Sequence, residues 1–259
     1  MKIAATIITL NEEQNLRRCL ASLQDVVDEI VVVDSGSRDR TVELAKSYGA
    51  RVLLRSWTNY SEQKNFAANE ATTAWILSLD ADECLSPELR DEIVALKSSE
   101  VRADAYSFPR KAFYLGKWIE HSGWYPDPKI RLYRKEKGNW EGGYVHETLR
   151  IDGKVVALKR DLLHFTCDSL SEHLLRMDRY TTLAAQDLHS RGKRSSFSRM
   201  ILSPVLTVLK LYLLKAGFRD GFQGIVIAGF AAYYNFVKFA KLGDLERRTT
   251  PNAAVAKQR

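Results

Sequence analysis

The sequence predicts an α/β fold in which a mostly parallel sheet is flanked by helices, followed by a C-terminal extension of amphipathic helices. Two observations support this fold class. The first 85 residues alternate short apolar runs with segments of helical periodicity, and the last third combines long apolar segments with scattered lysines and arginines. Strands that alternate with helices are typical of a parallel sheet, because each helix returns the chain to the edge where the next strand begins.

The N-terminal elements follow one another in a regular order. Strands are predicted at residues 3–10, 29–34, 51–54 and 74–79, where apolar residues are concentrated. Helices are predicted between them at 12–23, 41–48 and 63–71, and Gly49 stands where a helix C-cap glycine belongs. Sheets of this kind bind ligands at the carboxyl ends of their strands, so the residues that follow each strand are the first candidates for a functional site.

The remainder of the chain has a different texture. Residues 104–164 are rich in tryptophan, tyrosine, glycine and proline, and they predict shorter strands joined by long loops. A helix is predicted at 169–190, with Ser169 or Ser171 as N-cap and Gly192 after its end. We therefore expect one domain over 1–195, with halves at 1–100 and 101–195, and then helices and a polar tail over 196–259.

The charge of the chain indicates an anionic partner. The formal net charge is +7 and the isoelectric point is about 9.2, but no nucleic-acid-binding signature is visible, so a nucleic acid is not expected as a partner. The basic residues of the last third alternate with apolar stretches at 201–214 and 224–239, which favours an anionic membrane surface. Neither stretch has about 18 uninterrupted apolar residues, so we expect helices that lie on a bilayer rather than cross it.

The N-terminus and the cysteines indicate an intracellular protein. The first ten residues run into Asn11-Glu12-Glu13 without a small-residue cleavage site, so they predict a strand and not a signal peptide. The three cysteines are scattered and lack CxxC spacing, which argues against disulfides and a zinc site. We expect a cytoplasmic protein, peripheral on the inner face of the cell membrane. Nothing in the sequence fixes an oligomeric state.

Acidic and polar side chains follow three of the predicted strands. Thr9, Asn11 and Glu12 follow the first strand, Asp34 ends the second, and Asp80 begins the acidic run that closes a later one. An aspartate in such a position is as often a turn residue as a ligand, and for Asp34 alone both readings stand. Three such positions along one sheet edge favour a binding site.

Asp80 and Asp82 are spaced to share a metal ion. Two carboxylates two residues apart at the mouth of a sheet can reach one hard cation, and water and phosphate oxygens would complete its coordination. The expected cofactor is therefore Mg²⁺ or Mn²⁺. Glu83 is assigned to capping of the following loop.

The motifs around these residues resemble those of the family 2 glycosyltransferases, which have the Rossmann-like GT-A fold. The resemblance rests on ATIITLNEEQNL, EIVVVDSGSRDRT, LSLDADE and the QKN at 63–65. Within that family the chain is most similar to the lipopolysaccharide-core β-glucosyltransferases, through VHETL at 145–149 and GFRDGFQG at 217–224. The resemblance covers nearly the whole chain and implies a nucleotide-sugar donor.

Several roles follow from the resemblance on the donor side. It implies that Thr9, Asn11 and Glu12 lie against the nucleoside and that Asp34 hydrogen-bonds the base or ribose. It further implies that Lys64 meets the diphosphate or the base edge.

The resemblance also assigns the two aspartates that follow the strand at 74–79. Asp80 would approach the ribose or the sugar, and Asp82 would hold the metal. The metal would neutralise charge on the departing nucleoside diphosphate, so that no acid catalyst is needed.

Family members invert the anomeric carbon, and inversion requires a base that deprotonates the acceptor hydroxyl. Glu147 is the candidate base and Asp127 is the second candidate. Many relatives carry an aspartate of a Glu-Asp pair at this stage, and this sequence departs from that pattern. The structural alternative for Glu147 is an ion pair with an arginine such as Arg131.

Histidines and aromatic residues supply further candidates. His164 is an additional metal-ligand candidate, ahead of His146, although a histidine in an apolar run is as often a hydrogen-bonded core residue. Sugar stacking or core packing is open for four aromatic residues: Trp118, Trp124, Tyr125 and Trp140. Acceptor phosphate binding or a solvated basic face is open for four basic residues: Arg110, Lys111, Arg131 and Arg134.

The resemblance implies an inverting, metal-assisted transfer of glucose from UDP-glucose to a lipopolysaccharide-core or other lipid-linked acceptor. A polyprenyl-phosphate glycosyltransferase is the alternative, since there the phosphate is the nucleophile and no strong base is needed. A non-catalytic nucleotide-sugar-binding scaffold on the membrane is the third possibility. A nucleotidyltransferase is disfavoured, because no glycine-rich phosphate loop lies near the N-terminus.

Overall fold

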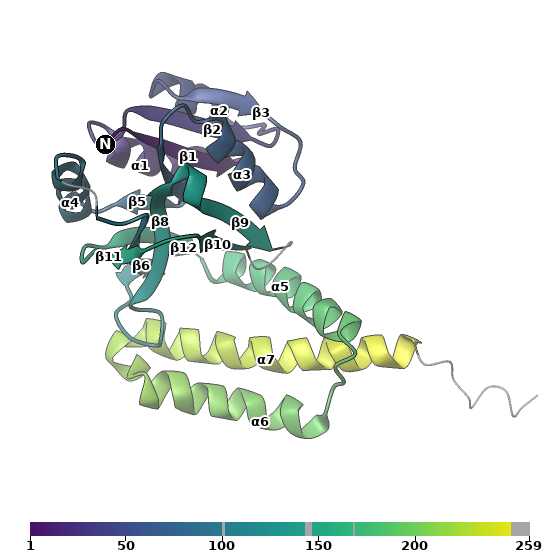
Figure 1. Ribbon diagram of the computed structural model, residues 1–259. Helices are drawn as coiled ribbons and strands as arrows, with labels where there is room; N and C mark the ends of the chain where they lie inside the picture. The colour runs from purple at the N-terminus through teal and green to yellow at the C-terminus, as the bar shows by residue number, and fades with distance from the viewer. Residues whose placement is uncertain (100–101, 143–146, 168, 250–259) are drawn as a thin grey trace, which may run out of the picture. The chain divides into compact units, whose positions relative to one another are not determined.

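The computed structural model describes residues 1–99, 102–142, 147–167 and 169–249 (Figure 1). His146, a candidate metal ligand in the sequence analysis, lies outside these residues. The chain forms two compact units, which we call the sheet unit (Met1–Phe113 and Tyr125–Thr166) and the helical unit (Tyr114–Trp124 and Cys167–Arg259). The sequence analysis placed residues 169–190 in the first domain, whereas the structure includes them in the helical unit.

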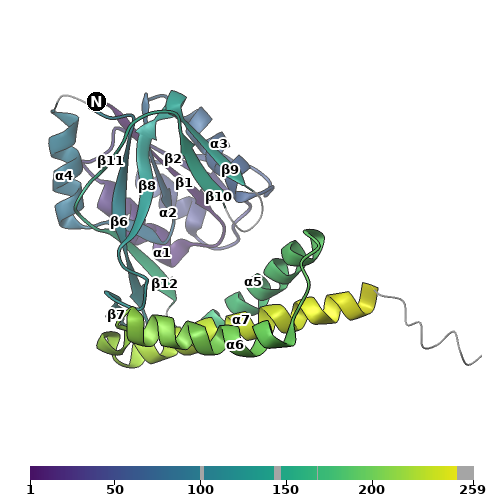
Figure 2. The ribbon, with the colours of Figure 1, turned by 60° about the horizontal axis from the view of Figure 1, so that its bottom comes forward.

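The sheet unit is built on a mixed sheet with the strand order β3-β2-β1-β4-β8-β6-β12-β5, in which β11 also pairs with β6. Strands β3, β2, β1 and β4 are parallel, and β8 joins β4 in the antiparallel direction. Figure 2 shows β1, β2, β6 and β8 of this sheet. A separate antiparallel pair is formed by β9 and β10. The strands of the unit are β1 (Ile3–Thr9), β2 (Glu29–Asp34), β3 (Arg51–Leu54), β4 (Trp75–Asp80), β5 (Glu83–Leu85), β6 (Ala105–Tyr114), β8 (Asp127–Arg134), β9 (Gly138–Gly142), β10 (Glu147–Ile151), β11 (Val155–Ala157) and β12 (Leu162–Cys167).

Helices cover both faces of this sheet. Alternate residues of a strand point to opposite faces, so Ile3 and Ile7 of β1 pack in one core while Ala4 packs in another. The first core also contains residues of α1, α2 and α4, and the second contains residues of α3. The helices are α1 (Glu13–Leu23), α2 (Thr41–Ser47), α3 (Tyr60–Glu70) and α4 (Pro87–Lys97), and a short 3₁₀ helix, η1, spans Lys135–Lys137. The predicted α/β fold class is confirmed.

Two predicted element boundaries differ from the structure for local reasons. Helix α3 begins three residues earlier than predicted, because the Asn59 side chain caps it by accepting a hydrogen bond from the Glu62 amide at 2.9 Å. In the middle of the chain, β6 and β8 are longer than the short strands that the composition suggested. Their prolines do not interrupt them, since Pro109 lies opposite Pro128 in the register.

The helical unit contains three long helices. Its elements are β7 (Lys117–Trp118), α5 (Leu170–Ser190), α6 (Phe197–Val208), η2 (Leu209–Leu214, a π-helical turn), η3 (Gly217–Asp220, 3₁₀) and α7 (Phe222–Thr249). Ser169 caps α5 as expected, because its hydroxyl accepts a hydrogen bond from the Glu172 amide. Helices α6 and α7 run side by side.

The GFRDGFQG motif forms the connection between η2 and α7. The Asp220 carboxylate is buried and accepts hydrogen bonds from the Ser122 hydroxyl at 2.9 Å and from the His121 amide at 3.1 Å. The backbone at Gly224 lies so close to the backbone at Gly217 that a Cβ on Gly224 would be 1.8 Å from the Gly217 carbonyl oxygen. This motif is therefore explained by packing within the helical unit.

The apolar C-terminal segments are longer in the structure than in the sequence analysis. Helix α6 continues into η2, so that Phe197–Leu214 forms 18 consecutive helical residues with a mean hydropathy of 1.5. None of these residues is buried. The segment Phe222–Arg248 has 27 residues and a mean hydropathy of 1.2. By length and composition alone, both segments could cross a membrane. The prediction that they lie on its surface stays a prediction.

The Gly224 contact generates a stability prediction. We expect Gly224→Ala to lower the free energy of unfolding by about 3 kcal/mol, because its methyl group must displace backbone. The matched control is Gly229→Ala in the same helix, where a Cβ meets nothing within 4 Å. That change should raise the free energy of unfolding by about 0.5–1 kcal/mol. Urea unfolding followed by circular dichroism measures both, and equal effects of the two changes would contradict the packing account.

Candidate functional site

The polar residues predicted at strand ends lie along one edge of the sheet. Thr9 is paired with Asp34 in the register of β1 and β2, and Ile8 is paired with Asp80 in the register of β1 and β4. Because these strands are parallel, their carboxyl ends coincide. The structure thus brings together the three strand ends selected from the sequence.

Asp34 is buried and its carboxylate is engaged by its own loop. It accepts hydrogen bonds from the Thr9 hydroxyl at 3.0 Å, the Gly36 amide at 3.0 Å and the Ser37 amide at 2.8 Å, and it also accepts one from the Ser37 hydroxyl. Gly36 adopts φ = 98°, a left-handed conformation that favours glycine. This geometry corresponds to the turn role considered for Asp34, and its contact with a base or ribose stays a prediction.

The loops after β1 and β2 are tied to each other. The Asn11 amide donates to the Ser37 hydroxyl and the Arg38 amide donates to the Asn11 side-chain oxygen, both at 2.8 Å. The Glu12 amide donates to the Thr41 hydroxyl at 2.9 Å. These bonds give the edge of the sheet a fixed shape, which a rigid nucleoside-binding wall requires.

The QKN motif lies on α3 and each of its side chains has a separate task. The Gln63 amide nitrogen donates to the Ser56 carbonyl oxygen at 3.1 Å and thereby fixes the loop before α3. The Asn65 side chain donates to the Trp140 carbonyl oxygen at 2.8 Å and accepts from the Trp140 amide at 2.9 Å, which attaches β9 to the helix. Lys64 between them is buried and points into the site.

Lys64 joins two of the predicted site carboxylates. Its Nζ lies 2.7 Å from Asp80 Oδ1 and 3.2 Å from Glu147 Oε1, and it is 4.4 Å from the centroid of the Trp140 ring. Glu147 therefore does form an ion pair, as the structural alternative required, but its partner is Lys64 and not Arg131. The predicted contact of Lys64 with a diphosphate or base stays a prediction.

Arg131 on β8 is the second buried cation of the site. One of its terminal nitrogens lies 2.7 Å from both Asp80 Oδ2 and Glu83 Oε1. Burial alone would raise the pKa of Asp80, but the charges of Arg131 and Lys64 outweigh burial and hold that pKa well below its usual range. Asp80 therefore stays ionised, although it is only partly exposed.

A cavity of about 430 Å³ opens beside this network. Its lining includes five of the residues chosen from the sequence for catalysis, binding or acceptor contact, namely Asp80, Arg110, Arg131, Trp140 and Glu147. Lys129 also lines it. A cavity of this size with a few convergent polar groups has the character of a small-molecule site.

The two base candidates have different surroundings. Asp127 is held by Arg110 at 2.7 Å and by Lys129 at 3.0 Å. Burial raises the pKa of Asp127, but the charge and hydrogen bonds of Arg110, together with Lys129, lower it below its usual value. Glu147 has one cationic partner and faces the cavity, so it is the better placed of the two to accept a proton.

The candidate metal ligands form a pair rather than a cluster. His164 Nε2 lies 3.2 Å from Asp82 Oδ2, and both side chains are partly exposed. Within the described ranges, no group of three or more His, Cys, Asp or Glu side chains could hold a metal ion. An imidazole and a carboxylate fit Mn²⁺ or Mg²⁺ if phosphate and water complete the coordination, whereas Asp80 is occupied by its two cations.

The sequence analysis did not assign the residues that organise the site. Glu83 was left to loop capping, but it is fully buried and accepts hydrogen bonds from Arg131 and Arg110. Arg131 and Arg110 were considered for acceptor phosphates or a solvated basic face, and Arg131 also as an ion-pair partner of Glu147, but neither was expected to pair with Glu83. Trp118 and Trp124, which were considered for sugar stacking, lie in the helical unit and not in the unit that contains the site. The signal for Glu83 was its place beside two aspartates at the mouth of the sheet.

A family model and related sequences show the family of this chain. The family model described as "Glycosyl transferase family 2" matches residues 5–156. The chain is 32% identical over 249 residues to "Lipopolysaccharide core biosynthesis glycosyltransferase LpsC" of Rhizobium meliloti, covering 93% of this chain and 92% of that protein. It is 31% identical over 259 residues to an uncharacterized glycosyltransferase of Rickettsia typhi, covering 96% and 89%. Among solved structures, S. aureus TarS 1-349 in complex with UDP-GlcNAc is similar with a TM-score of 0.46 and 15% identity, over 96% of this chain and 92% of that one.

The buried charge network generates a second stability prediction. We expect Arg131→Met to lower the free energy of unfolding by about 3–5 kcal/mol, since Glu83 and Asp80 lose a buried partner. Arg134→Met on the same strand is the matched control, because its ion pair with Asp104 is longer, at 3.5 Å, and partly exposed. Arg134→Met should lower the free energy of unfolding by less than about 1 kcal/mol. Chemical unfolding compares the two variants, and an Arg131 effect no larger than the control would refute the network's structural role.

Proposed function

The chain belongs to glycosyl transferase family 2 and is therefore a glycosyltransferase, and from that premise we propose an inverting, metal-assisted sugar transfer. The proposed donor is a nucleotide sugar, UDP-glucose by resemblance, and the proposed acceptor is a lipopolysaccharide-core or other lipid-linked hydroxyl. The relative named as a lipopolysaccharide core biosynthesis glycosyltransferase supports this acceptor class, since it aligns over nearly the full length of both chains.

One observation carries this proposal: Glu147 and Asp80 line the same cavity and are joined by Lys64. Asp80 ends a central strand on the donor side of the sheet, and Glu147 begins β10 on the acceptor side. The cavity between them is large enough for a hexose. Its position supports the assignment of Glu147 to the acceptor hydroxyl and of Asp80 to the donor sugar.

In the proposed reaction, Glu147 accepts the proton of the acceptor hydroxyl as its oxygen attacks the anomeric carbon. A new carbon–oxygen bond forms on one face of the sugar while the bond to the diphosphate breaks on the other, which inverts the configuration. The electron pair of the broken bond leaves with the diphosphate. Lys64 holds Glu147 and Asp80 in place through its two ion pairs.

Asp82 and His164 are the proposed metal ligands. A bound Mg²⁺ or Mn²⁺ would neutralise the charge that develops on the nucleoside diphosphate. Asp82 contacts His164, whereas Asp80 contacts Lys64 and Arg131. These different partners support a division of labour, in which Asp82 serves the metal and Asp80 serves the sugar or ribose.

The alternative reactions make different demands on Glu147. Transfer to a polyprenyl phosphate needs no strong base, because the nucleophile is already anionic. A carboxylate placed in the cavity supports a neutral hydroxyl acceptor over a phosphate. A non-catalytic scaffold is disfavoured by family membership and by the preserved Asp80-Ala81-Asp82 sequence.

The base assignment predicts a specific kinetic defect. Glu147→Gln should lower kcat for transfer by about 10²–10⁴-fold, because the amide cannot accept the proton. Donor binding should change little, since the amide keeps the shape of the side chain. Steady-state transfer from UDP-glucose and equilibrium binding of UDP measure the two effects separately.

Asp127→Asn is the matched control for this experiment. It changes the same functional group at the second candidate, which is already held by Arg110 and Lys129. A larger loss of kcat in Asp127→Asn than in Glu147→Gln would reassign the base. Normal turnover in both variants would favour the polyprenyl-phosphate reaction.

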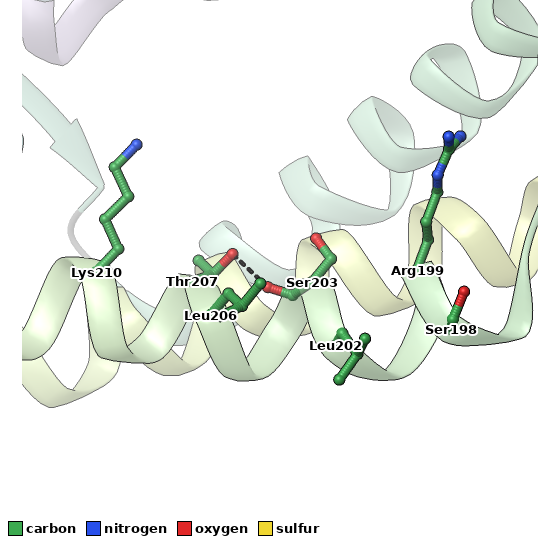
Figure 3. A pocket seen from close by; sticks show the side chains of 7 residues that line it. All are labelled: Ser198, Arg199, Leu202, Ser203, Leu206, Thr207 and Lys210. Carbon is green, nitrogen blue, oxygen red and sulfur yellow. Dashed lines mark hydrogen bonds between the residues drawn. The ribbon is translucent and has the colours of Figure 1, made fainter.

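A membrane surface is the proposed location, and α6 has the features required for it. Eight apolar side chains of the α6–η2 segment are exposed: Phe197, Ile201, Leu202, Val205, Leu206, Leu209, Leu213 and Leu214. Arg199 and Lys210 extend to one side of the helix, and Leu202 points away from that side (Figure 3). Cations along the edge of an apolar helix face are typical of a helix that lies in the interface of an anionic bilayer.

The charge of this region supports an anionic surface. Between residues 193 and 223 the chain has six basic side chains, Lys193, Arg194, Arg199, Lys210, Lys215 and Arg219, and one acidic side chain, Asp220. Asp220 is buried, so the six cations outnumber the acidic side chains at the surface of this segment. Location on the inner face of a cell membrane accords with this charge and remains part of the proposal.

The membrane assignment predicts lipid-dependent sedimentation. The double change Arg199→Gln/Lys210→Gln should weaken binding to vesicles of phosphatidylglycerol roughly 30-fold, because each cation near such a surface contributes about 1 kcal/mol. The control is Arg90→Gln in the sheet unit, which should bind as the wild type does. Equal binding of wild type to neutral and anionic vesicles would contradict the electrostatic part, and self-association without lipid binding would instead assign this face to a second copy of the chain.

A further inference from the structure

An arginine with no part in the proposed mechanism stacks on Phe165, the residue that follows the candidate metal ligand His164. Arg18 lies on α1, and its Cζ is 3.8 Å from the centroid of the Phe165 ring. The Phe165 amide donates to the Asp82 carbonyl oxygen at 2.9 Å, and Phe165 directly follows His164. Stacking therefore holds the guanidinium against Phe165, whose backbone joins β12, the strand of His164, to the loop that carries Asp82.

A second contact to the same guanidinium comes from Asn15, three residues earlier on α1. A terminal nitrogen of Arg18 donates to the Asn15 side-chain oxygen at 2.5 Å, and the Asn15 amide nitrogen donates to Glu12 at 2.9 Å. Glu12 belongs to the loop after β1, where the donor nucleoside is predicted to bind. Arg18 is thus fixed between the β1 loop and the Asp82 loop, which are the two sides of the proposed donor site.

The charge of Arg18 is not balanced as the other site cations are. Lys64, Arg131 and Arg110 each form ion pairs with carboxylates of the site. Across the residues that the structure describes, no carboxylate lies within ion-pair distance of Arg18. An exposed arginine without a counter-charge is ordinary on a surface, but such a side chain is normally free to move. Here the ring of Phe165 and the side chain of Asn15 both contact the guanidinium and restrict its rotamers.

We infer that Arg18 binds the diphosphate of the nucleotide-sugar donor, an assignment that rests on the proposed glycosyl transfer. A guanidinium presents five N–H donors in a planar fork that matches phosphate oxygens, and it stays charged at any working pH. Stacking on Phe165 occupies the face of the group, while Asn15 binds one of its terminal nitrogens. The remaining N–H groups point from the edge of the plane and are available to phosphate oxygens.

This role differs from that of the metal. When the bond between the anomeric carbon and the diphosphate oxygen breaks, its electron pair stays on that oxygen, and a fixed cation stabilises the added charge without rearrangement. Arg18 requires no metal to bind phosphate, so its contribution should remain when the metal is removed. Phe165 acts through Arg18 as a positioning residue.

The test is equilibrium binding of UDP and GDP to the full-length protein by isothermal titration calorimetry, with and without Mn²⁺. For the nucleotide that wild type binds, Arg18→Gln should raise Kd about 10- to 100-fold, which is the usual range for loss of a charge-assisted bond. Arg18→Lys should give an intermediate Kd. Binding of the corresponding nucleoside, followed by ligand-observed NMR, should change less than about twofold in both variants.

Arg17→Gln, at the neighbouring exposed position of α1, is the matched control and should bind UDP or GDP as the wild type does. Phe165→Leu should weaken nucleotide binding in the same direction as Arg18→Gln, but less. An unchanged Kd in Arg18→Gln, an equal loss for nucleotide and nucleoside, or a loss seen only with Mn²⁺ would overturn the assignment. If wild type bound neither nucleotide, the proposed function itself would fall, and that result is distinct from normal wild-type binding retained in Arg18→Gln.

Discussion

Asp80 ends a buried central strand, and two cations that lie against its carboxylate lower its pKa. These cations are Lys64 from α3 and Arg131 from β8, each at 2.7 Å. Both cations need carboxylates of their own in the same place, which Glu147 and Glu83 provide. One requirement for charge balance therefore joins α3, β4, β8 and β10, and the cavity lies where these elements meet.

Helix α3 connects the two halves of the proposed site. Gln63 fixes the loop that precedes the helix, Asn65 fixes the backbone at Trp140, and Lys64 between them bridges the donor-side and acceptor-side carboxylates. Three consecutive residues can perform these tasks because successive side chains on a helix point about 100° apart. A shift of α3 would therefore move the loop before the helix, the backbone at Trp140 and the Lys64 ion pairs together. The proposed reaction thus depends on the position of this helix.

The sequence predicted the elements whose signals are local. Strand β2 and strand β3 agree with the predicted bounds, and Thr9, Asp34 and Asp80 meet at one edge because parallel strands end together. The pairing of Arg131 with Asp80 and Glu83 was not predictable, since it joins residues about fifty positions apart through the antiparallel register of β8. The stacking of Arg18 on Phe165 was not predictable for the same reason, because it joins a residue of α1 to a distant residue of β12. Continuity of α6 with η2 was also hidden, as Lys210 interrupts the apolar run but not the helix.

The configuration of the transferred sugar tests the central claim most directly. Wild-type protein would be incubated with UDP-glucose, Mn²⁺ and a lipopolysaccharide-core oligosaccharide, and the coupling constant of the new anomeric proton would be measured by NMR. A base at Glu147 that acts on the face opposite the diphosphate predicts a β-linked glucose. An α-linked product would contradict the account, because retention requires a different arrangement of groups around the anomeric carbon.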